Sequence, residues 1–295
     1  MPPILLLRDE STHLSLDLPF MNCPSKQWLD AVGSGSGLVC LNMSDLRVQS
    51  NHIVVWNPAT KKFRFLPKTD DHHDLLGFEF FHDSRDYKVV NILKPGPDNT
   101  IRAKVFTRST KSWREVKSHY FCSSGAFLCG TFSSITLNGV LYSPIWIQER
   151  RSHRSHVLTV LSFNFHNEVF NVIPLPESSR KGQMKLLSWK NSLAFLGGRH
   201  CEPPRELWVM TEEPSAGTKQ IIWVKQFILE PSAVPGYIIG SWKEYLFGEN
   251  NSDEMQCYDP ASQKSYEMQD FQNIMIIDMV SFTKKPSTMW RPWFQ

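Results

Sequence analysis

Residues 54–67, VVWNPATKKFRFLP, have the pattern of two short strands joined by a polar turn. Apolar and polar residues alternate on both sides of NPATKK, which is typical of a half-buried β-hairpin. Similar stretches recur as AKVFTRSTKSWREV at 103–116, VLSFNFHNEVFNVI at 160–173 and QCYDPASQKSYEM at 256–268. The chain is therefore built from a repeated unit.

The repeat has a period of about 50 residues. Its units can be aligned on one large apolar residue near the end of the first strand, namely Leu7, Trp56, Phe106, Phe163, Val209 and Tyr258. A second anchor follows seven positions later in four units, as in Trp113 after Phe106. In the last two units we expect the second anchors to be Trp223 and Tyr266. Their place in the repeat predicts that these side chains pack in the core.

A second kind of apolar segment lies between the hairpins. Several of these segments are interrupted by a turn signal, such as GSG at 33–35, Asn138-Gly139 and Lys190-Asn191. Because Asn-Gly between apolar runs strongly favours a hairpin, each unit is expected to hold up to four strands. A single sheet of this size cannot bury both faces, whereas blades stacked around an axis can.

The six units predict an all-β fold, a kelch-like β-propeller of six blades. The chain begins with a hairpin, ILLLRD and HLSLDLP, and its last unit contains NIMIIDMVSF. Pairing of these N- and C-terminal segments in one blade would close the ring and remove two exposed edges. We predict a single domain over residues 1–295, with a terminal tail at about residues 284–295.

Blade topology separates the connections into two groups. Turns within the inner and outer hairpins share one face, here the turn face, while the linkers between blades and between the second and third strands share the long-loop face. The longer connections, QERRSHRSH among them, belong to the second group. Because scaffolds usually carry binding function in such loops, we expect a protein substrate to bind the long-loop face.

One basic run stands out among these loops. It consists of Arg150, Arg151, His153, Arg154 and His156. Clustered arginines bind acidic or phosphorylated groups, so we predict these residues as partner-binding; an exposed loop kept soluble by charge is the alternative. The cluster from Asp70 to Asp74, DDHHD, is expected to be a solvated loop, because ligands adjacent in sequence splay apart.

Composition excludes several classes of protein. The net charge of +3 and pI near 8.5 are too mild to indicate nucleic-acid binding. No apolar run approaches the ~20 residues that span a bilayer, and no secretory leader is recognisable, so we expect a cytoplasmic or nuclear protein. The six cysteines form no C-x-x-C pair, which favours reduced thiols. No nucleophile, phosphate-binding or zinc-protease motif occurs, and no catalytic residue, metal or cofactor is predicted.

The quoted segments resemble the F-box-associated domain of plant F-box proteins. GLVCL, VVWNPATKKFRFLP, GFEFFHDSRDYKVVNI, VFTRSTKSWREV, LNGVLYSPIW, VLSFNFHNEVFNVIPLP and ELWVMTE occur in the family's order, over roughly residues 4–283. The resemblance implies a kelch-like propeller that, with an N-terminal F-box, recognises substrates for cullin-based ubiquitin ligases. PPILLLRDESTHLSLDLP resembles the stretch that follows the F-box. Binding to a Skp-type adaptor is therefore expected only if an F-box is supplied outside this chain.

Three functional hypotheses remain open at this point. The first is a non-catalytic protein-interaction module, the substrate-recognition part of an SCF-type E3 ubiquitin ligase that directs substrate ubiquitination. The second is a propeller enzyme or carbohydrate-binding protein, which predicts that polar or metal-binding residues converge from several blades on the central channel. The third is a truncated paralogue with no ligase role.

Overall fold

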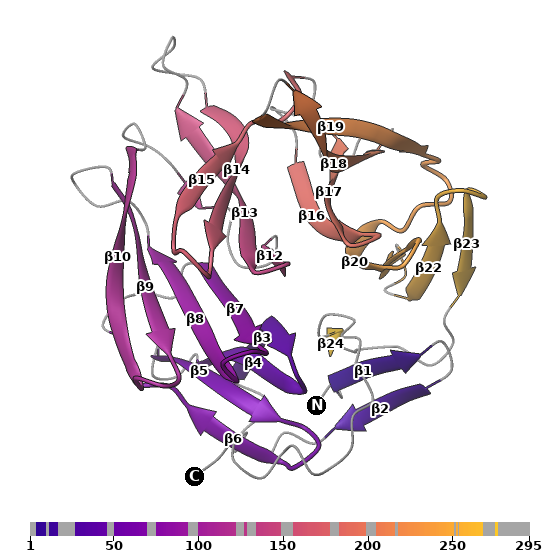
Figure 1. The fold of residues 1–295 in the computed structure, drawn as a ribbon. Helices are drawn as coiled ribbons and strands as arrows, with labels where there is room; N and C mark the ends of the chain where they lie inside the picture. Colours follow the sequence, from indigo (N-terminus) through magenta and orange to yellow (C-terminus); the bar gives the residue numbers. More distant parts are fainter. Residues whose placement is uncertain are drawn as a thin grey trace.

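The repeated units form a ring of sheets around a central axis (Figure 1). The computed structural model describes residues 4–9, 12–16, 27–45, 50–69, 75–93, 100–121, 127–128, 134–148, 156–177, 183–198, 205–215, 218–250, 252, 254–267 and 275–276. These residues contain strands and turns but no α-helix. Accordingly, the described residues include no helix of the length and hydropathy needed to cross a membrane.

Five sheets have four or five strands, which follow in chain order from the inner to the outer edge of the ring (Figure 1). The first consists of β3 (Gln27–Gly35), β4 (Leu38–Asp45), β5 (Ser50–Asn57) and β6 (Lys62–Phe65). The second consists of β7 (Leu75–Phe81), β8 (Asp86–Leu93), β9 (Thr100–Thr107) and β10 (Ser112–Phe121). In the third, β11 (Phe127–Leu128) and β12 (Ile135–Leu137) both pair with β13 (Val140–Gln148), followed by β14 (His156–Asn164) and β15 (Phe170–Ile173).

The remaining complete sheets have the same order. One consists of β16 (Gln183–Trp189), β17 (Ser192–Gly198), β18 (Arg205–Ser215) and β19 (Thr218–Leu229). The other consists of β20 (Tyr237–Trp242), β21 (Tyr245–Glu249), β22 (Met255–Asp259) and β23 (Lys264–Glu267). Within each of the five sheets all neighbouring strands are antiparallel.

The sixth sheet joins the two ends of the chain. It has the order β2 (Thr12–Leu16), β1 (Ile4–Asp9) and β24 (Met275–Ile276), and β24 pairs parallel to β1 through Ile4↔Met275 and Leu5↔Ile276. The predicted pairing of terminal segments is confirmed. The predicted six blades are not: the described residues form five complete blades and this three-stranded sheet, to which the last segment contributes one described strand, β24.

The inner strands of successive blades contact one another around the axis, in the pairs β3–β7, β7–β12, β12–β16 and β16–β20. Glycines allow the closest of these approaches. A methyl group on Gly33 would lie 3.3 Å from Cβ of Phe78, and one on Gly35 would lie 2.8 Å from Cβ of Phe80. Two residues further along β3, from Gly33 to Gly35, the contact lies two residues further along β7, from Phe78 to Phe80, so β3 and β7 run in the same direction. The turns that follow them therefore lie on the same face of the ring.

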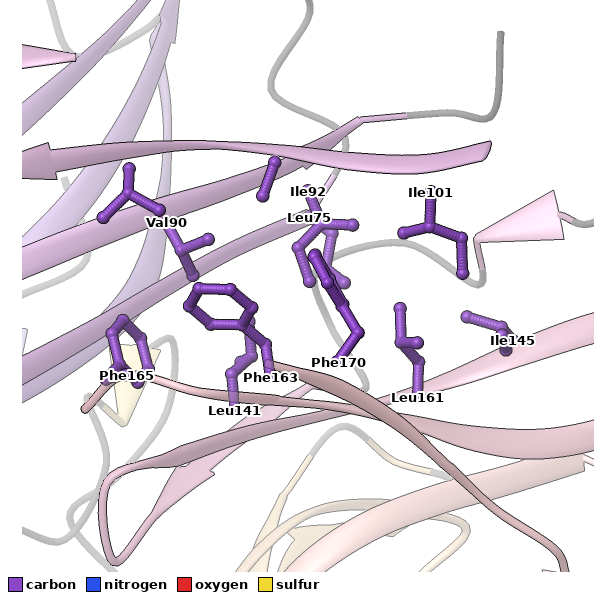
Figure 2. Packing of buried hydrophobic residues seen from close by; sticks show 12 residues of the cluster. Leu75, Val90, Ile92, Ile101, Leu141, Ile145, Leu161, Phe163, Phe165 and Phe170 are labelled. Atoms are coloured by element: carbon purple, nitrogen blue, oxygen red, sulfur yellow. The ribbon is translucent and has the colours of Figure 1, made fainter. Parts of the chain in front are cut away.

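Apolar side chains from neighbouring blades form the core. Between the second and third blades, twelve buried residues interdigitate (Figure 2): Leu75, Val90, Ile92, Ile101, Ala103, Val105, Leu141, Ile145, Leu161, Phe163, Phe165 and Phe170. Full burial of one such large side chain contributes about 1.5–3 kcal/mol. The cluster spans two sheets, so each blade needs its neighbour to bury its apolar face.

The turn residues predicted from the sequence adopt the conformations that hairpins require. Asn138-Gly139 has φ values of 51° and 76°, and Lys190-Asn191 has 49° and 63°, as in a type I′ turn. Both glycines of the GSG stretch at 33–35 lie in strand β3 instead, and the turn there is Ser36-Gly37. In the outer hairpins the last residue of each four-residue turn is left-handed, at Lys61, Lys111, Glu168 and Gln263.

Hydrogen bonds to backbone groups join consecutive blades just after the outer strand of the first blade ends. The indole N–H of Trp113 donates to the Pro67 carbonyl at 2.8 Å, and that of Trp223 donates to the Pro174 carbonyl at 2.9 Å. In the last complete blade, the Glu230 N–H donates to Gln263 Oε1 at 2.7 Å. Trp113 and Trp223 therefore hold the preceding blade both by packing and by a hydrogen bond.

Three of the predicted anchor pairs are off by one residue. Leu14, expected seven positions after its partner Leu7, lies opposite Leu6. Tyr258 lies opposite Ser265 and not Tyr266, whose side chain is 51% exposed. Trp223 lies opposite Met210, so Met210 and not Val209 occupies the position of the first anchor. A slip of one residue moves a side chain to the other face of a sheet, and apolar residues on both faces conceal it in the sequence.

Candidate interaction surface

The predicted partner-binding residues belong to the connection between β13 and β14. Arg150, Arg151, His153 and Arg154 lie outside the described residues. His156 is the first residue of β14 and lies opposite Gln148. The turn Asn138-Gly139 is at the other end of β13, so the β13–β14 connection leaves the blade from the long-loop face. The cluster at 70–74 and the tail at 284–295 also lie outside the described residues.

One linker of the long-loop group is described in full, at residues 230–236 between β19 and β20. The Arg205 guanidinium donates to the carbonyl groups of Pro235 at 2.8 Å and Gly236 at 2.6 Å. The N–H groups of Ala233 and Val234 donate to the Glu230 carbonyl at 3.1 and 3.0 Å. These bonds fix the linker between two blades and expose Pro231 and Ser232.

Three inner strands each carry a half-buried ionisable residue: Asp30 on β3, Glu79 on β7 and Lys185 on β16. Burial raises the pKa of Asp30 and lowers the pKa of Lys185. Burial also raises the pKa of Glu79, although hydrogen bonds from the N–H groups of Gly139 and Phe80 to its carboxylate act in the opposite direction. Across the described ranges, no three His, Cys, Asp or Glu side chains are placed to hold a metal ion.

The thiols that the structure describes are free. Cys40 is buried and Cys257 is half-buried, and the other four cysteines lie outside the described residues. Burial raises the pKa of both thiols, to about 11 for Cys257, where the neighbouring Asp259 carboxylate adds to the effect. Neither thiol has the lowered pKa of a reactive cysteine.

An ion cluster on the turn face was not predicted from the sequence. Glu168, in the turn between β14 and β15, accepts a hydrogen bond from Lys88 of the preceding blade at 2.8 Å and also contacts Arg114. Lys88 donates to the Phe165 carbonyl at 2.8 Å as well, and its ammonium lies over the Phe81 ring. Eighty residues separate Lys88 and Glu168, so no local sequence pattern could have revealed the pair.

A comparison with protein families matches residues 9–292 to the F-box associated beta propeller domain. The match covers nearly all of the ring. The chain belongs to the F-box associated β-propeller family. This agrees with the all-β propeller that the strands form.

The curated relatives of this F-box associated propeller are F-box proteins of Arabidopsis thaliana. F-box protein At2g21930 is 29% identical over 221 residues, which are 70% of this chain and 52% of that protein. Putative F-box protein At1g47730 is 29% identical over 177 residues, 59% of this chain and 42% of the relative. F-box/kelch-repeat protein At3g23880 is 26% identical over 63% of this chain and 50% of its own length. The chain thus spans about half the length of the relatives it matches.

Similarity to solved structures is much weaker. The structure described as "Structure of YjhT" covers 82% of this chain and 73% of its own chain, with a TM-score of 0.46 and 12% sequence identity. The propeller domain of the Trilobed protease from Pyrococcus furiosus covers 86% of this chain and 76% of its own chain, with a TM-score of 0.39 and 15% sequence identity. No functional conclusion is drawn from similarities of this size.

Proposed function

We propose that this chain is a non-catalytic protein-interaction module, the substrate-recognition part of an SCF-type E3 ubiquitin ligase. The observation that carries the proposal is the family match over residues 9–292, together with relatives that are F-box proteins. The module holds a substrate close to a partner enzyme that carries ubiquitin, and proximity raises the rate of transfer. No catalytic side chain is then needed in this chain.

The substrate binds the long-loop face in this proposal, with Arg150, Arg151, His153, Arg154 and His156 among the contacting residues. Two observations support this choice of face. The β13–β14 connection leaves its blade at that end, and the described linker at 230–236 is held by backbone-directed hydrogen bonds from Arg205. A fixed linker on this face gives a partner a preorganised surface, which lowers the cost of binding.

The proposal extends to the arrangement of the chain. Residues 1–295 form a single domain, and the sheet of β2, β1 and β24 takes the place of a sixth blade in a kelch-like ring. The parallel pairing of β1 with β24 and the contacts between successive inner strands support this. The protein acts in the cytoplasm or nucleus, and it binds a Skp-type adaptor only when an F-box is joined to it.

The test uses two forms of the protein, the chain alone and the chain joined at its N-terminus to the F-box of At2g21930. We expect only the joined form to bind purified Skp-type adaptor, measured by calorimetry, and both forms to capture the same proteins from a plant extract. In a reconstituted cullin ligase, those proteins should be ubiquitinated with the joined form alone. Adaptor binding by the chain alone, or capture of substrates that the joined form never ubiquitinates, would overturn the proposal.

A further inference from the structure

The turn Asn138-Gly139 combines a chemically labile sequence with a position where three blades meet. Asn-Gly deamidates more readily than other asparagine dipeptides, because glycine has no side chain to shield its nitrogen from the asparagine carboxamide. The turn joins β12 to β13 in the third blade, β12 contacts β7 of the second blade, and Asn138 contacts Asn191 of the fourth. Asn138 is exposed, whereas Gly139 is buried. Water therefore reaches the labile side chain, while the backbone nitrogen beside it is enclosed.

Other strands hold both polar groups of Gly139. In a two-residue hairpin turn, the N–H of the second turn residue has no partner in the strand ladder. Here the Glu79 carboxylate, on β7 of the preceding blade, accepts the Gly139 N–H. The Gly139 carbonyl accepts the Phe165 N–H at 2.9 Å. A methyl group on Gly139 would lie 3.0 Å from two atoms of the His166 ring, so the nitrogen has little room to move.

Deamidation must begin at this nitrogen. Gly139 N loses its proton and forms a bond to Asn138 Cγ, the Cγ–Nδ2 bond breaks, and Nδ2 takes up a proton and leaves as ammonia. Water then opens the five-membered imide at either carbonyl, which gives aspartate or isoaspartate. The attacking group is an amide anion, and a like charge beside it disfavours its formation. An ionised Glu79 at the Gly139 N–H therefore opposes the first step.

The Asn138 side chain is also held by a neighbouring blade. Its Nδ2 donates a long hydrogen bond to the Asn191 carbonyl, at 3.5 Å. A carboxylate at position 138 has no proton to donate, so deamidation would remove this contact between the third and fourth blades. Isoaspartate would in addition insert one main-chain carbon into a two-residue turn whose φ values of 51° and 76° fit a type I′ geometry. Modification would thus loosen two junctions of the ring.

We propose that Asn138 is a site of spontaneous deamidation whose rate is set by Glu79 of the neighbouring blade. While the second and third blades stay packed, the carboxylate and the enclosed turn suppress the reaction. Opening of that junction removes Glu79 from the Gly139 N–H and releases the site. The product does not revert to asparagine, so the modified fraction increases with the time that the junction spends open. This inference goes beyond the proposed function and is tested without adaptor or ubiquitin.

The test incubates the full chain at mildly alkaline pH and follows deamidation at each asparagine by peptide mass mapping. Glu79→Gln keeps an acceptor oxygen but removes the charge, and it should raise the initial rate at Asn138 at least about threefold. Unfolding of the wild type in urea should raise the rate at least about tenfold. Asn191-Ser192, in the turn of the fourth blade, is an internal control whose initial rate should not change in Glu79→Gln. Glu115→Gln makes the same change in net charge at an exposed carboxylate and should leave both rates unchanged.

Several outcomes would overturn the inference. One is an unchanged rate at Asn138 in a Glu79→Gln variant that melts at the wild-type temperature or above. A slower rate would make Glu79 a base that promotes the reaction, and equal acceleration at Asn138 and Asn191 would indicate general loosening of the ring. If Glu79→Gln does not fold, Glu79→Asp tests the same contact, because its shorter side chain withdraws the carboxylate from Gly139. It should also raise the rate, and an unchanged rate there would overturn the inference too.

Discussion

Replacement of Glu168 by Gln tests whether the ion cluster between the second and third blades stabilises the ring. The side chains of Lys88 and Glu168 are only 18% and 11% exposed, so their contact is mostly desolvated. A hydrogen bond to a charged partner in such a place contributes about 1.5–3 kcal/mol. The contact to Arg114, which is 53% exposed, adds at most about 1 kcal/mol. We therefore expect Glu168→Gln to lower the free energy of unfolding by about 2–3 kcal/mol.

The assay is equilibrium unfolding in urea, followed by tryptophan fluorescence, with Glu115→Gln as the matched control. Glu115 forms a looser pair with Arg102, at 3.9 Å, and the two side chains are 42% and 31% exposed. Its replacement should cost less than about 0.5 kcal/mol, because exposed pairs contribute little. A double-mutant cycle with Lys88→Met isolates the coupling between Lys88 and Glu168, which should account for most of the loss.

The reasoning is refuted if Glu168→Gln and Glu115→Gln have the same small effect. It is also refuted if the Lys88–Glu168 coupling is near zero while Glu168→Gln destabilises strongly. In that case the cost would come from the turn itself, where Glu168 has a left-handed φ of 58°. Salt provides an independent check, since the contact is mostly shielded from solvent and the difference between wild type and Glu168→Gln should persist at high ionic strength.

Three other substitutions have defined outcomes. Gly77→Ala places a methyl group 2.7 Å from Cδ2 of the buried Leu141, so it should lower the free energy of unfolding in urea by about 1–3 kcal/mol. The control Gly240→Ala, whose methyl group would have no atom within 4 Å, should lower it by less than about 1 kcal/mol. Trp113→Phe keeps an aromatic ring but loses the bond to Pro67, and calorimetry should show a loss of about 0.5–1.5 kcal/mol. Burial holds the pKa of Glu79 above its ordinary value, so the wild type loses stability as the pH rises from the unfolded-state pKa towards the folded-state pKa. The free energy of unfolding of Glu79→Gln minus that of the wild type should therefore be larger at pH 7 than at pH 4. Equal differences at the two pH values would contradict this.

The sequence predicted which segments form strands and hairpins better than it predicted which residues pair across them. The alternation around NPATKK and the Asn138-Gly139 signal correctly predicted hairpins, because turn geometry depends on a few adjacent residues. Ser265 was missed as the partner of Tyr258, because a small polar residue gives no hydrophobic signal, even though its hydroxyl donates to the Ala233 carbonyl in the linker between β19 and β20. The roles of Gly33 and Gly35 also depend on a neighbouring blade, and the sequence suggested only a turn.

The interaction surfaces were less predictable than the fold. The run from Arg150 to His156 is conspicuous because its charges are adjacent in the sequence, and most of it lies outside the described residues. The run has three arginines, whereas the first two complete blades carry six strong cations in three segments spread between residues 58 and 111: Lys61, Lys62, Arg64, Arg85, Arg108 and Lys111. Each segment alone has the composition of an ordinary hairpin turn. Only the direction of β3 relative to β7 brings them together.

The pairing of β1 with β24 also sets the order in which the protein can fold. Residues 4 and 5 leave the ribosome about 270 residues before their partners at 275 and 276. During synthesis β1 therefore keeps one unpaired edge until residues 275 and 276 have emerged, and an open edge favours pairing with other chains. Closure of the ring is necessarily a late, long-range event with a high loop-closure cost. The emergence of β24, and not the folding of any single blade, determines when that edge is protected.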